Sequence, residues 1–292
     1  MNFIKHKRIY YAISSILILA SLVSLAFLGV NFGIEFTGGS MMEIEYSENV
    51  PSVSELRGVL NNAGLSDAII QSAGENGFVL RMPDISQEKY IELRGLLVGS
   101  TENYFESIGP TIGDELKDKS AISIIIASLA IILYIALTFR DAGDRKVKSW
   151  QYGMVAAGVG FFHDVLIVLG AFSIMGYLYG IQFTVPIAVA LLTVLGYSIN
   201  DTVVVFDRIR ENIAKNPRLL FPDIVNKSLN ETLERSINTS ATTLFVLIAI
   251  FILGGETIRW FVFAMILGIS VGTYSSIFIA GPLLVTWFNN KK

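Results

Sequence analysis

Long apolar stretches recur along the chain and predict six membrane-spanning helices. The hydrocarbon core of a bilayer is about 30 Å thick, so a helix needs about 20 predominantly apolar residues to cross it. The stretches that reach or approach this length are 9–30, 122–139, 154–179, 183–206, 236–253 and 260–288. We therefore expect a polytopic α-helical membrane protein.

A polar segment, 31–119, separates the first two apolar stretches, and its pattern predicts a small α+β domain. Met42, Ile44 and Tyr46 alternate with polar residues, which is typical of a half-buried strand. Elsewhere in the segment, apolar residues recur at helical spacing or form short β-type runs on either side of a GENG turn. The expected elements are strand 42–46, helix 52–63, strands 68–72 and 78–82, helix 86–98 and strand 103–108. This β-α-β-β-α-β order is that of the ferredoxin-like fold.

The pattern divides the chain into four expected parts. They are the N-terminus with the first span (1–30), the ferredoxin-like domain (31–119), the other five spans (120–288) and a short tail (289–292). Within the third part, segment 207–235 is more than a linker, because Pro222 is followed by an apolar stripe that includes Ile224 and Leu229. We expect a short helix there, lying in the membrane interface and leading into the fifth span.

The distribution of basic residues predicts the orientation in the membrane. Of the 22 Lys and Arg residues, 15 lie in the N-terminus, in 140–149, in 207–235 and in the tail. Lys and Arg concentrate on the cytoplasmic side, whereas long segments such as 31–119 are translocated largely regardless of charge. We therefore expect both termini in the cytoplasm and 31–119 outside. The first apolar stretch exceeds the roughly 7–15 residues of a signal peptide, which favours an uncleaved anchor.

Composition supports a membrane protein and excludes several kinds of site. Hydrophobic residues make up 52% of the chain and charged residues only 16%, compared with about 25% charged residues in soluble domains. The absence of cysteine excludes disulfides, zinc–thiolate sites and thiol chemistry. A net charge of −3 without a basic tract gives no indication of nucleic-acid binding. We expect no catalytic residue, no metal and no cofactor, and interpret 31–119 as a binding or docking module.

An acidic residue inside the fourth apolar stretch is the first candidate for function. Asp201 follows Ser198 and Asn200 and lies in the cytoplasmic half of the predicted span. A charged Asp at a helix centre costs about 2.5–3.5 kcal/mol, less towards the ends. Protonation would remove this cost, so Asp201 is a candidate proton carrier. The alternative is that its side chain only reaches out to the headgroups.

The fifth stretch begins with a polar face that could serve this carboxyl group. Arg235, Asn238 and Thr239 share one helical face, and Ser236 and Ser240 lie on a second. Our hypothesis is that Arg235 approaches Asp201 and releases it when the carboxyl group is protonated. The alternative is that the hydroxyl groups only pack helices together in the lipid.

The third stretch contains another pair of titratable residues. Gly153, Ala157, Gly160 and Asp164 recur at spacings of four, three and four, so Asp164 lies on a face suited to close helix packing. It is a second candidate for a proton relay. His163 is expected on a different face, and a structural, hydrogen-bonded role is favoured for it over proton handling.

Six motifs, in order and within this topology, carry a resemblance to a known family. They are FGIEFTGG (32–39), GPTIGDEL (109–116), FHDV (162–165), GYSINDTV (196–203), VFDRIREN (205–212) and RSINTS (235–240). The chain resembles the SecF family of bacterial protein-export membrane proteins, which belongs to the resistance–nodulation–division superfamily. One position departs from the family pattern: Glu35 stands where the family usually has Asp, which keeps the charge and adds a methylene group.

The resemblance implies partners and a function. SecF would pair with SecD and associate with the SecYEG channel in the bacterial cytoplasmic (inner) membrane. There it would use the proton-motive force to help move unfolded secretory polypeptides outwards, with membrane lipid around its spans. The family's intramembrane Asp corresponds to Asp201 and its Arg of the fifth span to Arg235, and its outer domain contacts the emerging chain.

Three other functions remain open at this point. A proton-driven exporter of small molecules or lipids in the same superfamily would usually have two six-span halves in one chain, whereas this chain has one. An intramembrane enzyme would need a nucleophile, and we expect no Ser or Glu to be placed as one. A purely structural role would make the charge of Asp201 dispensable.

Overall fold

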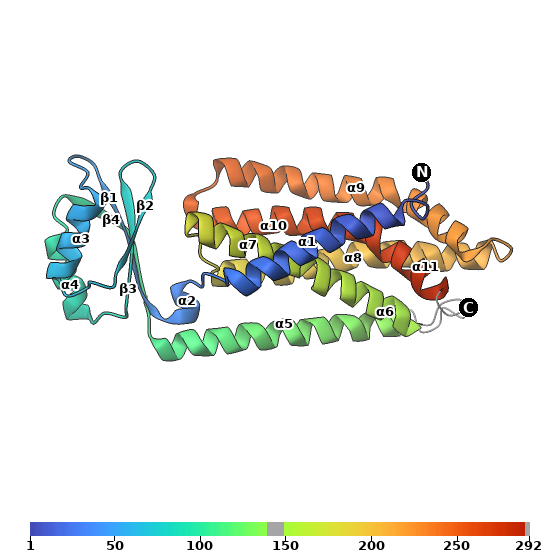
Figure 1. The fold of residues 1–292 in the computed structure, drawn as a ribbon, viewed down its shortest axis with the longest axis horizontal. Helices are drawn as coiled ribbons and strands as arrows, with labels where there is room; N and C mark the ends of the chain where they lie inside the picture. Colours follow the sequence, from blue (N-terminus) through green and yellow to red (C-terminus); the bar gives the residue numbers. More distant parts are fainter. Residues whose placement is uncertain (139–148, 290–292) are drawn as a thin grey trace. The chain divides into compact units, whose positions relative to one another are not determined.

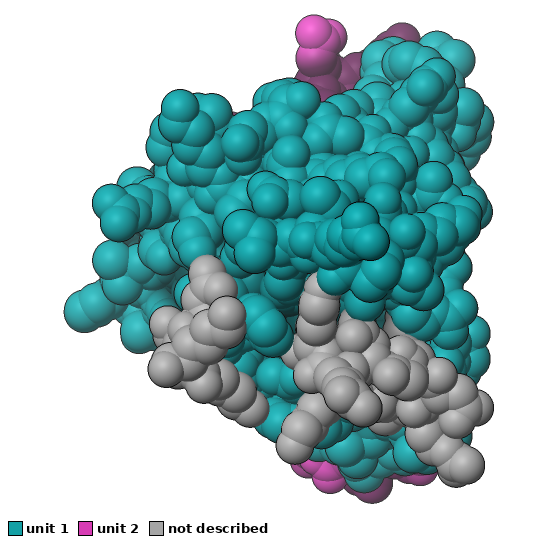
Figure 2. Space-filling model, turned by 90° about the vertical axis from the view of Figure 1, so that its right-hand side faces the viewer, with its two compact units in different colours: residues 1–30, 122–181, 186–292 teal, residues 31–121, 182–185 magenta. Residues whose placement is uncertain are grey.

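The computed structural model describes residues 1–138 and 149–289 (Figure 1). The predicted loop 140–149, except its last residue, and the predicted tail 289–292, except its first, lie outside the described residues. The chain forms two compact units, which Figure 2 shows in different colours. The membrane unit comprises Met1–Val30, Ile122–Ile181 and Pro186–Lys292. The second unit, which we call the outer unit after the side of the membrane expected for it, comprises Asn31–Ala121 and Gln182–Val185.

Six helical spans in the described part of the chain are long and apolar enough to cross a membrane, as predicted. Four of them are single helices: α1 (Lys7–Phe27), α5 (Pro110–Thr138), α8 (Val185–Lys215) and α9 (Phe221–Leu253). The other two contain π-helical turns. The third span consists of α6 (Ser149–Ala157), η1 (Gly158–Val165) and α7 (Leu166–Tyr179), and the sixth of α10 (Glu256–Ser275), η2 (Ser276–Ala280) and α11 (Gly281–Asn289).

The fourth and sixth spans form the centre of the membrane unit. More than half of each apolar window is buried within the chain, 56% in both, whereas the window in α5 is only 6% buried. Small residues bring these helices close together. A side chain at Gly272 of α10 would meet Ser198 of α8 at 2.8 Å, and one at Gly268 would overlap Val194. Such small-residue contacts replace the hydrophobic effect as the basis of packing in lipid.

The helix expected near Pro222 is present and leads into the fifth span, but the expectation of a separate short helix in the membrane interface is wrong. Helix α8 continues to Lys215, and α9 begins at Phe221 and runs without interruption into the fifth span. Ile224, Val225 and Leu229 are buried within the protein. An apolar stripe indicates that a face is covered but does not distinguish protein from lipid as the cover. Neither Gly nor Pro occurs between 223 and 253, so the helix has no reason to end before the span.

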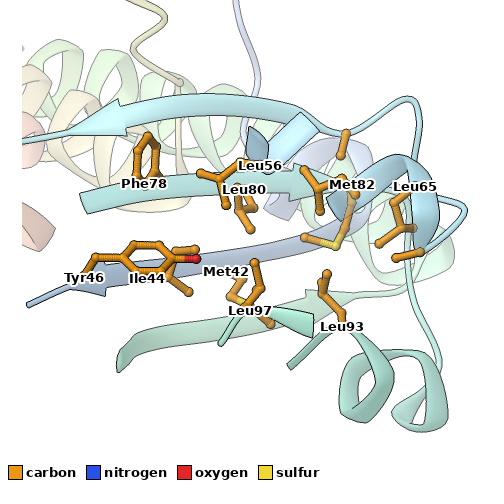
Figure 3. Packing of buried hydrophobic residues seen from close by; sticks show 13 residues of the cluster. Met42, Ile44, Tyr46, Leu56, Leu65, Phe78, Leu80, Met82, Leu93 and Leu97 are labelled. Atoms are coloured by element: carbon orange, nitrogen blue, oxygen red, sulfur yellow. The ribbon is translucent and has the colours of Figure 1, made fainter. Parts of the chain in front are cut away.

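The outer unit contains the predicted ferredoxin-like sheet. Its strands are β1 (Gly39–Tyr46), β2 (Ile69–Ala73), β3 (Gly77–Met82) and β4 (Ser100–Ile108), antiparallel in the order β2-β3-β1-β4. Helices α3 (Val53–Asn62) and α4 (Gln87–Leu96) supply the other half of the core. Figure 3 shows this core, which includes Met42, Ile44, Tyr46, Leu56, Phe78, Leu80, Leu93 and Leu97.

Two glycine-containing motifs meet where the chain enters and leaves the outer unit. Gly38, which follows α2 (Ile34–Thr37), and Gly39, the first residue of β1, both have positive φ, +70° and +128°. A side chain at Gly38 would lie 2.8 Å from the Cα atom of Pro110, and one at Gly39 would lie 2.8 Å from the carbonyl oxygen of Met82. Only glycine combines this backbone with such close neighbours.

The short loop between the third and fourth spans also belongs to the outer unit. Phe183 donates its backbone N–H to the carbonyl oxygen of Asn31 at 2.7 Å, and its own carbonyl oxygen accepts from Gly33 at 2.9 Å. The rings of Phe32, Phe36 and Phe183 pack together, with centroids 5.7–6.0 Å apart. As a result, α8 begins at a residue, Val185, that belongs to the outer unit.

Candidate functional site

Asp164 is a fully buried carboxyl group at the end of the π-helical turn η1. Its Oδ2 accepts hydrogen bonds from the hydroxyl groups of Ser198 on α8 and Ser275 on α10, the second at 3.0 Å. Its Oδ1 lies 2.7 Å from Nδ1 of His163. Three polar contacts therefore compensate the burial of this acid, which is the arrangement that a buried ionised carboxylate requires.

The expectation that His163 and Asp164 face apart is wrong, because their side chains contact each other directly. The expectation assumed α-helical geometry, in which successive side chains point about 100° apart. Here both residues lie in a π-helical turn, a geometry that often occurs at functional sites. His163 is 3% exposed, so its polar ring must also find partners within the protein, and both side chains turn towards the same polar cluster.

His163 connects this acid to the first span. Its Nε2 lies 2.9 Å from the hydroxyl group of Ser14 on α1, and its ring stacks on Tyr274 of α10. When Asp164 is ionised it can only accept, so Nδ1 of a neutral His163 carries the proton and Nε2 accepts from Ser14. The sequence had no signal for Ser14, because a single serine in an apolar stretch is common.

Asp201, the first predicted candidate, is buried with fewer partners. It is 7% exposed, and its Oδ1 accepts a hydrogen bond of 2.8 Å from Ser236 on α9. Its other oxygen, Oδ2, is buried and has no hydrogen-bond partner among the described residues. An ionised carboxylate with one hydrogen bond is poorly compensated, whereas a protonated carboxyl group carries no charge to compensate.

The structure places Ser236, rather than Arg235, against the carboxyl group of Asp201. Arg235 is exposed and acts on Asp201 electrostatically, from beyond hydrogen-bond distance. It lines a polar groove of about 560 Å³, together with Asp207, Arg208, Glu211 and Glu231 and four uncharged residues of α5, α8 and α9. The charged side chains of this groove, including that of Arg235, therefore lie beside the part of α8 that follows Asp201.

The other predicted polar residues are divided between the two acids and the surface. Ser198 binds Asp164 and not Asp201. Asn200, Asn238 and Thr239 are exposed in this chain, and Thr239 donates to the carbonyl oxygen of Arg235 at 2.8 Å. The inward face of α9 is thus the second predicted stripe, with Ser236 and Ser240, and not the stripe headed by Arg235.

A second set of hydroxyl groups, missed in the sequence, continues along α8. Thr202 lies 2.8 Å from Ser276 in the π-helical turn η2, and Ser276 donates to the carbonyl oxygen of Ser198 at 3.1 Å. Ser198, Asp201 and Thr202 stand on adjacent turns of one helix. The π-helical turns η1 and η2 therefore both contact residues 198–202 of α8, the stretch that contains Asp201.

Glu35, the residue that departs from the family pattern, lies in the outer unit. Burial raises the pKa of Glu35, and nearby Glu106 adds to this effect. Hydrogen bonds from the backbone amides of Glu35 and Val185, and the charge of Arg81, oppose the rise. The described residues contain no cluster of three or more His, Cys, Asp or Glu side chains that could hold a metal ion.

Comparison with known families assigns the chain. Residues 93–290 match the family described as "Protein export membrane protein SecD/SecF, C-terminal", and residues 23–50 match the "SecD/SecF GG Motif". The chain belongs to the SecD/SecF family. The second match contains Gly38 and Gly39, the close-packed pair at the entry to the outer unit.

Individual relatives agree with this family. The chain is 38% identical to a protein translocase subunit SecF of Thermobaculum terrenum, over 99% of this chain and 94% of the relative. It is 40% identical to a SecF of Desulfurispirillum indicum, over 94% and 88% of the two chains. It is also 37% identical to the SecDF of Thermus thermophilus, where 97% of this chain matches only 38% of a longer protein.

Solved structures show the same fold. The crystal structure of the Thermus SecDF, described as a translocon-associated membrane protein, superposes with a TM-score of 0.87 at 35% identity. The match covers 99% of this chain and 39% of that chain. SecDF in its super-membrane-facing form gives a TM-score of 0.71 over the same share of its length. The chain is therefore a multi-pass membrane protein that spans about two fifths of the SecDF structures.

Proposed function

We propose that this protein helps to move secretory polypeptides across the bacterial cytoplasmic membrane, and that it draws on the proton-motive force through Asp201. Relatives named as translocase subunits support the role in Sec-associated export. The observation that carries the proton step is the buried Oδ2 of Asp201, which has no hydrogen-bond partner among the described residues. A carboxylate in that state lacks the contacts that would compensate its charge, so binding a proton removes an unfavourable interaction.

The energies of proton entry and of charge burial are comparable. A proton that moves across about 100 mV gains about 2.3 kcal/mol. Placing a charged Asp within a membrane helix costs about 2.5–3.5 kcal/mol at the centre. Each proton that binds or leaves Asp201 can therefore shift the balance between two helix arrangements by a useful amount. The hydrogen bond from Ser236 on α9 to Asp201 is the interaction whose strength would change with the charge of the carboxyl group.

Asp164 would connect a movement at Asp201 to the first span. Asp164 and His163 join α8 to Ser14 on α1 through hydrogen bonds, and α1 leads directly into the outer unit. Helix α8 itself begins at Val185, within the outer unit. Movement around Asp201 would thus reach the outer unit along two continuous stretches of chain. The outer unit would then act on the emerging polypeptide.

SecD is the partner with the most support. The Thermus relative is named SecDF, and the part similar to this chain is little more than a third of it, so the two subunits' sequences are joined there. We propose that SecD corresponds to the part of SecDF that this chain lacks, that it associates with this chain, and that the pair works with the SecYEG channel. The expected orientation, with both termini in the cytoplasm and the outer unit on the opposite side, suits such a role.

Export driven by the proton-motive force alone tests this proposal. Vesicles containing the full complex would first import a substrate partway with ATP, and ATP would then be removed. We expect Asp201→Asn to abolish the remaining, proton-driven movement, while the ATP-driven step continues. Asp164→Asn should weaken it less, because the amide retains contacts to the hydroxyl groups. Normal proton-driven movement with an assembled Asp201→Asn complex would contradict the proposal.

One observation favours a second candidate, a serine hydrolase. Contrary to expectation, a serine is placed as a nucleophile would be. The hydroxyl group of Ser14 lies 2.9 Å from Nε2 of His163, and Nδ1 of His163 lies 2.7 Å from Oδ1 of Asp164. However, hydrolysis also needs backbone N–H groups that are free to stabilise an oxyanion. Ser14 lies within α1, where the N–H groups are used by the helix itself.

A fluorophosphonate probe separates the two candidates. The probe forms a covalent bond with an activated serine, so a hydrolase would be labelled at Ser14. We expect no labelling of the purified protein above the level of Ser14→Ala. Labelling that is lost in both Ser14→Ala and His163→Ala would favour the hydrolase.

A further inference from the structure

A large apolar groove lies beside the polar cluster of the membrane unit. It has a volume of about 850 Å³ and is formed by α1, the α6–η1 segment and the η2–α11 segment. Most of its lining is apolar and includes the aliphatic residues Ile18, Val155, Val159, Ile279 and Leu283. This volume is within the range of about 300–1,000 Å³ that is typical of small-molecule sites.

One end of the groove is polar and lies next to the ammonium group of Lys7. The hydroxyl group of Thr286 lies 3.0 Å from that of Tyr11 and accepts a hydrogen bond of 3.1 Å from Nζ of Lys7. Trp287 lines the groove at this end, and its ring packs edge to face on Trp150, with centroids 5.3 Å apart. Tyr, Trp and Lys together are typical of the level of the lipid headgroups.

We propose that this groove binds an anionic phospholipid, with one acyl chain along the aliphatic lining and the phosphate group at Lys7. The spans α1 and α10–α11 cross the membrane, so the groove opens onto a surface where acyl chains are the available apolar ligand. An ammonium group has three N–H donors, and Thr286 takes one, which leaves two for phosphate oxygens.

Charge complementarity favours an anionic over a zwitterionic lipid. Lys5 precedes the first span and Lys7 and Arg8 begin it, whereas the first acidic residue of the sequence is Glu35, beyond that span. Lys7 stands at the N-terminal end of α1, next to the C-terminal end of the sixth span. The headgroup would therefore lie at the end of the membrane unit that the basic residues predict to be cytoplasmic.

The bound chain would also cover the polar cluster. Ser14 and His163 both line the groove. On α1, Ser14 lies further from the Lys7 end of the groove than Tyr11 does. An acyl chain there would cover the side of the groove that Ser14 and His163 line. The site thus connects lipid composition to the Ser14–His163–Asp164 cluster, and its existence does not depend on the proton step at Asp201.

Brominated lipids test the site, because bromine quenches tryptophan fluorescence at contact. The chain has three Trp residues, and Trp260→Phe leaves only the pair at the groove. The full-length protein would be placed in nanodiscs of phosphatidylcholine with a small fraction of brominated phosphatidylglycerol or brominated phosphatidylcholine. We expect about a fivefold preference for the anionic lipid, which is the contribution of one lysine near the surface.

Two pairs of variants make the test specific. Gly158 lines the groove and has open space around its Cβ position, so Gly158→Leu should fill the groove and abolish most of the preference. Gly196→Leu, also at an open helix position, is the matched control and should leave it unchanged. Lys7→Gln should remove the preference and Lys7→Arg should keep it.

Three results would overturn the proposal. The first is equal quenching by both brominated lipids in the parent protein. The second is a preference that survives Gly158→Leu in protein that remains folded by circular dichroism and gel filtration. The third is protection of both tryptophans from either lipid, which would show that a protein helix covers the groove.

Discussion

Two buried carboxyl groups lie on or against the same stretch of α8, with different surroundings. Asp164 has contacts to Ser198, Ser275 and His163, whereas Asp201 has one, to Ser236. A hydrogen bond to a charged group contributes about 1.5–3 kcal/mol, so the two acids differ greatly in how well their charge is compensated. We therefore propose that Asp201 is the acid that changes charge and that Asp164 has a positioning role.

At the same scale, Glu35 should respond to pH in the outer unit. Its pKa is raised chiefly by burial, so the folded state binds the proton more tightly than the unfolded chain does. The stability that this proton contributes is fully present below the ordinary pKa of glutamate and is lost as the pH rises through the raised pKa. We expect the carbon-13 resonance of the Glu35 carboxyl group to titrate above the ordinary value of about 4.3.

Glu35→Gln provides the control for this titration. The amide cannot ionise, so the gain in stability of the outer unit on acidification should become smaller in the variant. A titration midpoint of Glu35 at or below the ordinary value, or an unchanged pH dependence in Glu35→Gln, would contradict the account of this residue.

At the scale of elements, the stability of the outer unit should depend on the glycine pair Gly38 and Gly39 at the start of β1. Gly39→Ala forces a side chain into a backbone with φ of +128° and against the carbonyl oxygen of Met82. Strain of this kind costs about 1–3 kcal/mol. We expect faster hydrogen exchange of the β1 and β3 amides, measured by mass spectrometry on the full-length protein.

Gly58→Ala is the matched control for that change. Gly58 is exposed on α3 with open space around its Cβ position, so alanine there should stabilise the helix by up to about 1 kcal/mol. Equal exchange rates in Gly39→Ala and the parent protein would show that the close contact is not structurally important.

The elements also show what the sequence could and could not predict. Periodicity located the six spans and the β-α-β-β-α-β order, because each element buries one regular face. It failed for segment 207–235, where an apolar stripe packs within the protein and not on lipid. It failed again at His163, because a π-helical turn has no recognised sequence pattern and changes which side chains meet.

The candidate site was predictable in part for a similar reason. A lone acid in an apolar stretch is conspicuous, so Asp201 and Asp164 could be selected. Their partners could not, because Ser14, Ser236 and Ser275 are ordinary residues of membrane helices whose importance depends on which helices pack together. Arg235 was expected against Asp201 for its charge, but the nearer Ser236 occupies that contact.

At the scale of the whole molecule, the chain passes between its two units at four places, and two of these passages lie within the helices α5 and α8. Helix α5 begins in the outer unit and continues into the membrane unit, and α8 begins at Val185 of the outer unit and carries Asp201. A continuous helix transmits displacement along its length. The proposed coupling therefore needs no additional contact surface between the units to carry the effect of a proton.

Infrared spectroscopy of the reconstituted full-length protein tests the central claim most directly, because a protonated carboxyl group has a C=O stretching band that a carboxylate lacks. We predict a band that grows as the pH falls, is absent in Asp201→Asn, persists in Asp164→Asn, and shifts in Ser236→Ala, where the hydrogen bond is lost. A spectrum in which Asp201 stays ionised at every pH that preserves the fold would contradict the account.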